Sequence, residues 1–219
     1  MASQGRDNVL NSLERHFTNR VEEYGASHGA VDWGSTFRQQ LAFRQMLRIL
    51  ENPATAEIAQ GFSLLDYGCG YGALLPYLKQ RGFNFGAYTG YDMVVAMIDS
   101  ARNTFSEIAD STFTTDEPNL TPVDYVIGSG LISLRLDNEA AAWGEHVLRM
   151  LDRLWSLSAK GLAFNSLTSY SDTDKMRADL YYPDPRMLFD YCKTHFSKQV
   201  ALLHDYGVYE FTILVRREP

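Results

Sequence analysis

The chain has 219 residues, of which 45% are hydrophobic, and this is enough to bury one sizeable core. Its formal net charge of −7 argues against a nucleic-acid partner, because such a partner requires a surplus of Lys and Arg to neutralise phosphates. No apolar run approaches the length of a membrane span and the N-terminal residues lack the apolar core of a signal peptide, which predicts a cytoplasmic protein without a membrane partner.

Two helices are predicted before the first strand. Residues 7–24 place their apolar side chains on one face, and Gly25 is a suitable helix stop. A loop with three glycines follows, and a second helix is predicted over 36–51, ending before Pro53. Residues 1–54 are therefore predicted to form a helical cap, separate from an α/β domain over residues 55–219.

From Phe62 onward, predicted strands and helices alternate, which is typical of a doubly wound sheet. The predicted strands are 62–67, 85–91, 111–115, 123–127, 161–165, 199–204 and 209–215, and the predicted helices are 72–81, 93–108, 138–157 and 185–196. A short turn makes the last two strands an antiparallel pair. Residues 166–183 carry three tyrosines and no clear period, which predicts a lid loop or a short helix.

Cysteine and histidine spacings carry no metal or disulfide signal. Cys69 and Cys192 lie far apart in the sequence, and the five histidines form no local cluster. The sequence therefore predicts neither a disulfide nor a bound metal.

The first predicted strand ends in the string Asp66-Tyr-Gly-Cys-Gly-Tyr-Gly72, and a helix follows it. Gly68 and Gly70 permit backbone angles and a close ligand approach that a Cβ would block, and Gly72 allows tight packing of the helix on the strand. A strand–turn–helix unit of this kind is typical of a nucleotide-binding corner. The spacing Gly-x-Gly-x-Gly differs from that of pyrophosphate binders, and the alternatives are a purely structural turn or another kind of nucleotide binder.

In this setting, the string resembles the first motif of class I S-adenosylmethionine (SAM)-dependent methyltransferases. The resemblance covers about residues 55–216. It implies SAM as the cofactor and a Rossmann-like α/β fold, with helices on both faces of a seven-stranded, mostly parallel sheet. The implied strand order is 3-2-1-4-5-7-6 with strand 7 antiparallel, and the N-terminal helices would cap the SAM-binding catalytic domain.

The cofactor is expected at the carboxyl ends of the strands, where doubly wound sheets bind ligands. Asp92, about 20 residues beyond the last glycine, is expected to accept the two ribose hydroxyls, and capping of the next helix is the alternative. The resemblance assigns Asp66 to the amino-acid end of SAM. Met93 is a candidate for packing on the adenine face, with core packing as the alternative. Asp116 or Glu117 is a candidate to accept the adenine amino group, with a solvated loop charge as the alternative. The full predicted cofactor set is Asp66, Gly68, Cys69, Gly70, Tyr71, Asp92, Met93, Asp116, Ser129 and Gly130.

Methyl transfer from a sulfonium depends on oriented binding and requires no universal catalytic residue. Polar residues at the expected active edge are nevertheless candidates, with packing or turn formation as the alternative for each. Asn165 and Tyr170 are the predicted catalytic residues, and the predicted substrate-binding residues are Tyr24, His28, Trp33, Tyr182 and Tyr206. The acidic charge and the absence of an Asn-Pro-Pro-Tyr signature after the fourth strand favour N- or O-methylation of a small molecule.

Two other functions remain open from the sequence. A closed, aromatic-rich pocket would also suit attack of SAM's own amine on its γ-carbon, which releases methylthioadenosine. A SAM-binding module without catalysis is the second alternative, although intact glycines and Asp92 argue against it. The sequence predicts neither the acceptor nor the oligomeric state.

Overall fold

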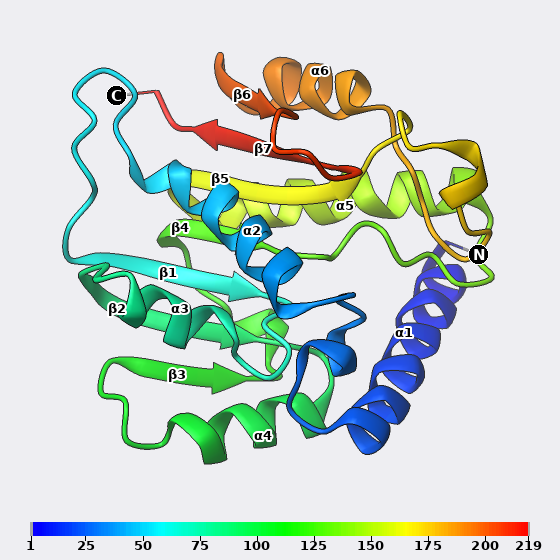
Figure 1. Ribbon diagram of the computed structural model, residues 1–219, viewed down its shortest axis with the longest axis horizontal. Coiled ribbons are helices and arrows are strands. Elements are labelled where there is room, and N and C mark those ends of the chain that lie inside the picture. The colour runs from blue at the N-terminus through cyan, green and yellow to red at the C-terminus, as the bar shows by residue number, and fades with distance from the viewer. Residues whose placement is uncertain (1, 219) are drawn as a thin grey trace.

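The computed structural model describes the backbone of residues 2–218 and the side chains of residues 9–218 (Figure 1). A single seven-stranded sheet forms its centre, in the order β3-β2-β1-β4-β5-β7-β6. The strands are β1 (Phe62–Tyr67), β2 (Phe85–Tyr91), β3 (Ser111–Thr114), β4 (Val123–Gly128), β5 (Ser158–Leu167), β6 (Gln199–Leu203) and β7 (Glu210–Arg216). Strand β7 runs antiparallel to β5 and β6, and the other pairs are parallel. The predicted fold class and strand order are confirmed.

Helices pack on both faces of this sheet. They are α1 (Ala2–Tyr24), α2 (Thr36–Met46), α3 (Leu74–Gln80), α4 (Val95–Phe105), α5 (Ala140–Leu157) and α6 (Pro185–His195). Helices α2, α3 and α4 contribute buried side chains to the core on one face, and α5 and α6 contribute to the core on the other. Helix α1 instead crosses the edge where the parallel strands end, at the right of Figure 1.

The strands agree closely with the sequence-based ranges, whereas several helix boundaries differ for local reasons. The predicted helix 36–51 ends at Met46 and continues as a 3-10 turn, η2 (Leu47–Leu50). Helix α4 begins at Val95 because Asp92 accepts the N–H of Val94 and fixes the residues between them in a turn. Residues 166–183 contain one 3-10 turn, η4 (Thr173–Lys175), and no α-helix.

The two predicted cap helices have different surroundings. Phe43, Met46 and Ile49, from α2 and η2, belong to the core that α3 and α4 share on one face of the sheet. Helix α2 is therefore one of the helices that cover this face. Helix α1 and the 3-10 turn η1 (His28–Val31) pack on each other and reach α4. The domain boundary at residue 54 therefore stays a prediction, and the core contacts cross it.

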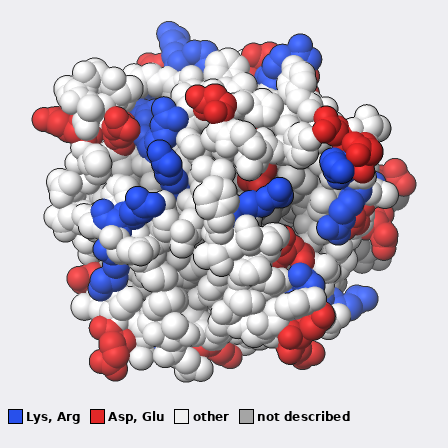
Figure 2. Space-filling model, in the orientation of Figure 1, with Lys and Arg blue, Asp and Glu red and all other residues white. Residues whose placement is uncertain are grey.

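Charges of both signs are interspersed on the face shown in Figure 2, where the basic group at the upper left is flanked by acidic residues. Among the described helices, none combines the length and the apolar character needed to cross a membrane.

Candidate active site

The glycine turn between β1 and α3 is held against the end of β2. The N–H groups of Gly68 and Cys69 both donate to the carbonyl of Tyr91, at 2.7 and 2.8 Å. Gly68 and Gly70 adopt φ values of 74° and 54°, which favour glycine. A Cβ on Gly68 would collide with the Leu131 side chain, and one on Gly70 would lie 2.6 Å from Val31. The turn therefore requires glycine at both positions.

Asp92 connects the end of β2 to this turn. One carboxylate oxygen accepts the N–H of Gly70 at 2.8 Å, and the other accepts the N–H of Val94 at 2.9 Å. Burial raises the pKa of Asp92, and these backbone hydrogen bonds oppose the rise. Each oxygen keeps a second lone pair, so the carboxylate remains able to accept two more hydrogen bonds.

Asp66 is the more deeply buried carboxyl group, with 2% of its surface exposed. Burial raises its pKa to about 7, although the hydroxyl of Tyr88 donates to it at 2.7 Å. It takes part in no ion pair among the described residues. A cationic ligand beside Asp66 would stabilise its ionised form.

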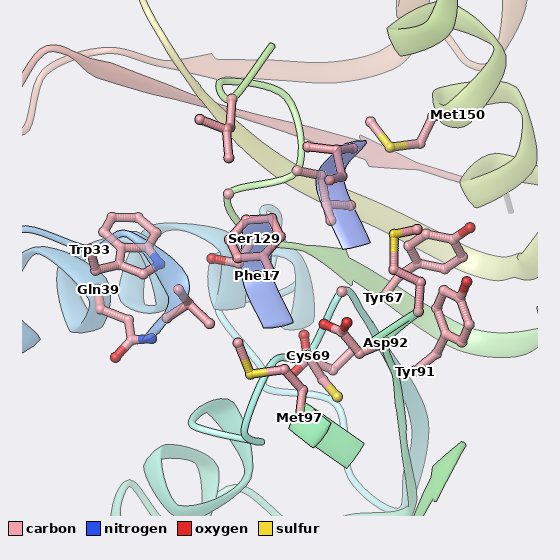
Figure 3. Close-up of a pocket in the computed structure, with 18 of the residues that line it drawn as sticks. Phe17, Trp33, Gln39, Tyr67, Cys69, Tyr91, Asp92, Met97, Ser129 and Met150 are labelled. Carbon is pink, nitrogen blue, oxygen red and sulfur yellow. The ribbon is translucent and has the colours of Figure 1, made fainter. Parts of the chain in front are cut away.

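A cavity of about 140 Å³ lies over the glycine turn (Figure 3). Its outer wall comes from the N-terminal region, and its floor comes from the ends of β1, β2 and β4. The lining residues are Leu13, Phe17, Val31, Trp33, Gln39, Phe43, Asp66, Tyr67, Gly68, Cys69, Tyr91, Asp92, Met93, Met97, Ser129, Gly130, Leu131, Leu134, His146 and Met150. Tyr67 and Tyr91 lie side by side at an aromatic end of the cavity next to Asp92, and Met150 lies on the same side of the view.

Two features of the lining suit a polar ligand with an aromatic part. The hydroxyl oxygen of Ser129 is buried and has no hydrogen-bond partner among the described residues, which is costly unless a ligand supplies one. The ring centroids of Tyr67 and Tyr91 lie 4.6 Å apart at the aromatic end of the cavity. No group of three or more His, Cys, Asp or Glu side chains within the described part of the chain converges as a metal site would require.

Comparison with known proteins decides the family. The family described as a methyltransferase domain matches residues 35–199. The candidate methyltransferase Rv1506c of Mycobacterium tuberculosis is 50% identical over 159 residues, which cover 73% of this chain and 95% of that protein. The chain belongs to the class I SAM-dependent methyltransferases. SAM is accordingly its cofactor, and the resemblance seen in the glycine string is confirmed.

Solved structures agree on the fold of this methyltransferase. Magnesium protoporphyrin IX methyltransferase from Synechocystis PCC 6803, with SAH bound, superposes with a TM-score of 0.67 at 17% identity, covering 95% of this chain and 100% of that chain. The DhpI–SAH complex superposes with a TM-score of 0.64 at 14% identity, covering 96% and 98%. At these identities the likeness concerns the fold alone.

The residues of the cavity fit SAM. The glycine turn leaves room for close backbone approach, two carboxyl groups face the same space, and a buried hydroxyl lacks a partner within the described chain. A polar, cationic amino-acid end and a flat aromatic base match the two ends of such a cavity. Burial raises the pKa of the Cys69 thiol well above its usual range, so this cysteine is suited to packing and not to reaction.

Most of the predicted cofactor residues line the cavity of the methyltransferase. Gly70 and Tyr71 are not part of the lining: Gly70 holds Asp92, and the Tyr71 hydroxyl donates to Gln39 at 3.1 Å. Asp116 lies outside the cavity, where its carboxylate accepts a hydrogen bond from Asn119 at 2.7 Å. The structure therefore does not bring Asp116 to the position expected for an adenine contact.

Among the predicted substrate-binding residues, Trp33 lines the cavity. The ring of His28 donates to the backbone carbonyl of Trp33 at 2.9 Å and so stabilises the position of Trp33 without lining the cavity itself. Tyr24 lies on the surface beneath the Arg20 guanidinium, and the Tyr182 hydroxyl accepts the N–H of Arg177. The side chains of His28, Tyr24 and Tyr182 all lie outside the cavity lining.

The remaining predicted polar residues lie toward β5 and β7. Tyr206 is partly buried and its hydroxyl bonds Thr212, while Tyr170 is 59% exposed; neither lines the cavity. Asn165 is buried and supports the rim, because its side-chain oxygen accepts the N–H of Gly130 at 2.9 Å. Its side-chain nitrogen donates to Glu210 at 2.9 Å.

Several cavity residues are not predicted from the sequence. Tyr67 and Tyr91 are strand-end neighbours of the predicted acids Asp66 and Asp92, so the same strand-end argument could have found them. Leu13 and Phe17 reach the cavity from α1, and no local signal in the sequence indicates that contact. Further unpredicted lining residues are Val31, Phe43, Met97, Leu131, Leu134, His146 and Met150, whereas Gln39 is a candidate from the sequence that does line the cavity.

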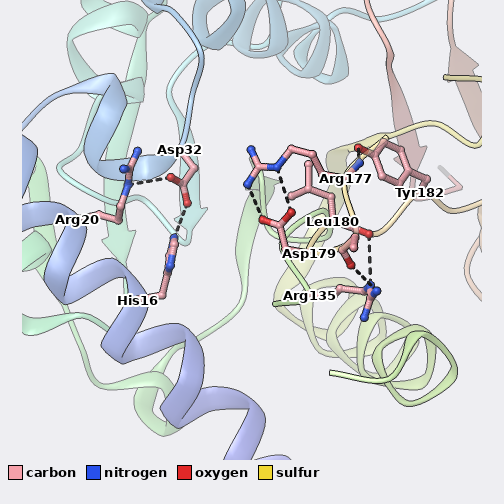
Figure 4. Close-up of polar contacts among 9 residues, drawn as sticks. His16, Arg20, Asp32, Arg135, Arg177, Asp179, Leu180 and Tyr182 are labelled. Carbon is pink, nitrogen blue, oxygen red and sulfur yellow. Dashed lines mark hydrogen bonds and ion pairs between the residues drawn. The ribbon is translucent and has the colours of Figure 1, made fainter. Parts of the chain in front are cut away.

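Two ion-pair clusters face each other beside α1 (Figure 4). On the cap, Asp32 bonds the His16 ring at 2.6 Å and the Arg20 guanidinium at 2.8 Å. Opposite it, Arg177 pairs with Asp179. The clusters are close enough for His16 to help lower the pKa of Asp179, after the hydrogen bond from Arg177 itself. These contacts hold the cap on one side and the segment after β5 on the other.

Proposed function

We propose that the protein transfers the methyl group of SAM to a nitrogen or oxygen atom of a small-molecule acceptor. The observation that carries this proposal is the cover over the glycine turn: α1, η1 and Trp33 close the space through which an acceptor must approach. A cover at this position leaves room for a small-molecule acceptor and obstructs a folded protein acceptor. The comparison with magnesium protoporphyrin IX methyltransferase is consistent with a small acceptor.

The polar end of the cavity suits the amino-acid and ribose parts of SAM. Asp66 has no cationic partner in the described chain and supplies the counter-charge for the SAM ammonium group. Asp92 keeps lone pairs for both ribose hydroxyls while the N–H groups of Gly70 and Val94 fix its orientation. The unpartnered hydroxyl of Ser129 is available to the amino-acid end.

The aromatic end of the cavity suits adenine. Tyr67, Tyr91 and Met150 offer aromatic and thioether surfaces there, and Met93 follows directly after Asp92. These side chains replace Asp116 in the proposed adenine site, because Asp116 is bonded to Asn119 outside the cavity.

Bound SAM supplies an activated methyl group on a positively charged sulfur. The chain's contribution is to orient the acceptor, exclude water and hold the acceptor in line with the bond that breaks. Oriented binding alone can lower such a barrier by about 7–11 kcal/mol. Trp33 and Gly130, which line the cavity next to each other, are the residues proposed to set this orientation.

A product assay tests the proposed function. The full chain is incubated with SAM alone and with a panel of small amines, alcohols and carboxylic acids, and the nucleoside product is identified by mass spectrometry. S-adenosylhomocysteine (SAH) that forms only in the presence of an acceptor supports methyl transfer. Methylthioadenosine formed from SAM alone would instead indicate attack of the SAM amine on its own γ-carbon.

A further inference from the structure

Glu210 is a carboxyl group that the proposed cofactor site does not use. It is partly buried at the first position of β7. Its carboxylate accepts a hydrogen bond from the neutral amide of Asn165, at 2.9 Å. It takes part in no ion pair among the described residues, and burial raises its pKa to about 7. A buried charge with so little compensation is costly, and such groups concentrate at functional sites.

The sheet topology places Glu210 at the active edge. Strand β7 is antiparallel to β5, and Glu210 pairs with Leu167, the last residue of β5. The start of β7 therefore lies beside the carboxyl end of β5, on the same edge of the sheet as the carboxyl end of β4 (Figure 1). Gly130, Asn165 and Glu210 form one hydrogen-bonded row across the ends of these three strands.

The hydrogen-bonded row of Gly130, Asn165 and Glu210 reaches both the protein surface and the cofactor cavity, because Gly130 belongs to both. Gly130 is solvent-exposed and also lines the cavity, so it forms part of the rim. Trp33 covers the same glycine, with its ring 3.8 Å from the position of a Cβ on Gly130. An acceptor that crosses this rim toward the proposed methyl group passes next to the Asn165–Glu210 pair.

The charge balance at Glu210 favours a cationic group. Arg38 is close enough to oppose the rise in the pKa of Glu210, but it forms no ion pair with it and its side chain is exposed on α2. A hydroxyl group would add a hydrogen bond and leave the buried charge uncompensated, whereas an ammonium group provides both.

We propose that Glu210 binds a protonated amine of the methyl acceptor, beside the rim formed by Gly130 and Asn165. The inference rests on the proposed function and adds the chemical class of the acceptor. It concerns the group that is recognised, which need not be the atom that is methylated.

Two probes with one carbon skeleton test this inference. The full chain, labelled with ¹⁵N and saturated with SAH, is titrated with phenethylamine and, separately, with 2-phenylethanol. Phenethylamine is expected to shift the side-chain amide resonances of Asn165 and the backbone amide of Gly130, while 2-phenylethanol leaves them unchanged. Equal shifts from both probes, or no shift from the amine, would overturn the proposal.

Charge variants make the assignment specific to Glu210. E210Q is expected to weaken phenethylamine binding at least about tenfold, the scale of a lost charge-assisted hydrogen bond, and to keep the SAH affinity of the unchanged protein. R38Q removes the nearby competing cation and is expected to strengthen amine binding. The control D190N removes an exposed carboxylate on α6 and should leave amine binding unchanged.

Calorimetry with SAH separates the two possible failures. If SAH does not bind the unchanged protein, the proposed function fails. If SAH binds and E210Q keeps both the SAH affinity and the amine affinity of the unchanged protein, only the assignment of Glu210 fails. Retention of SAH binding by E210Q also shows that the variant is folded.

Discussion

Two carboxyl groups share the cofactor cavity, yet their hydrogen-bond partners differ. Asp92 accepts two backbone N–H groups, which favour its ionised form. Asp66 accepts a hydrogen bond from only one tyrosine hydroxyl, and its almost complete burial outweighs that bond and favours the neutral form. Asp92 is therefore tested through its hydrogen bonds to the ligand, and Asp66 is tested through its charge.

Replacing Asp92 tests the proposed ribose contact. D92N is expected to weaken SAH binding by about 1.5–3 kcal/mol, or roughly 10- to 100-fold, because hydrogen bonds to a charged acceptor are lost. The matched control D116N should change the affinity by less than about twofold, because Asp116 lies outside the cavity. Calorimetric titration with SAH measures both values, and a larger loss in D116N would reverse the assignment of the two residues.

The charge of Asp66 predicts a pH-dependent affinity. The carboxyl group must be ionised to pair with the ammonium group of SAH, and burial raises its pKa to about 7. The SAH affinity should therefore fall as the pH drops below about 7, by roughly tenfold per pH unit. Calorimetry across this range measures the slope. D66N is expected to bind SAH weakly with no such slope, and an unchanged slope in D66N would assign the titration to another group.

Strand ends explain how much of the site the sequence predicts. Asp66, Gly68 and Asp92 each lie within one residue of the end of a strand. Their positions depend on strand direction, which the alternation of elements indicates. Asp116 lies one step further into a loop, where its hydrogen bond to Asn119 determines its direction. Glu210 could not be predicted, because its contact with Asn165 depends on the register between β5 and β7.

At the scale of elements, α1 determines access to the cavity. Leu13 and Phe17 form part of the cavity wall, and apart from η1 the helix packs chiefly on α4. Its links to η1 include the ion pairs of His16 and Arg20 with Asp32, which adopts a left-handed φ of 56° at the end of η1. An element with few core contacts opens more readily than the sheet beneath it.

Hydrogen exchange tests this role of α1. SAH binding should slow exchange of the amides in residues 9–24 by roughly tenfold or more, because the ligand fills the space against Leu13 and Phe17. Peptides from α6, which lines no part of the cavity, should show no comparable change. F17A is expected to lose most of the protection in α1. Protection that is equal in α1 and α6 would contradict a local covering role.

Helix α1 could be predicted from the sequence, but its contacts could not. The apolar spacing of residues 7–24 predicts a helix, and the structure confirms one over Ala2–Tyr24. Periodicity identifies the apolar face and not its neighbour, so the contact of Phe17 with the cofactor cavity is not predictable from it. In the loop after α1, Asp32 holds both α1 and η1 through side-chain contacts between distant residues, which no local pattern indicates.

For the whole molecule, the alternation of strands and helices and the resemblance in the glycine string together predict the sheet order, and both the order and the antiparallel β7 are confirmed. The acceptor site could not be predicted in the same way, because the proposed site combines Trp33, Gly130 and Glu210 from three separate parts of the chain. Such a combination depends on packing of the cap against the strand ends and on the register of β7.

Stability of the ligand-free protein should depend on pH in the direction opposite to SAH binding. Asp66 has a folded-state pKa of about 7 against an ordinary value of 3.8, so the native state binds more protons than the unfolded state between these values. The resulting stability is present below about pH 4 and is lost as the pH rises to 7. The loss is on the order of 4 kcal/mol, because each pH unit between the two pKa values contributes roughly 1.4 kcal/mol.

Other carboxyl groups determine where this dependence is visible. Glu210 acts in the same direction as Asp66, because burial raises its pKa to about 7 as well. Asp124, Asp179 and Asp184, whose pKa values are lowered, lose their contributions only at more acidic pH. Urea unfolding at several pH values between about 4.5 and 8 measures the dependence. D66N and E210Q should each reduce the pH dependence of the unfolding free energy. If the stability of the unchanged protein instead rises with pH across this range, the two carboxyl groups are not buried without an ion pair at the active edge.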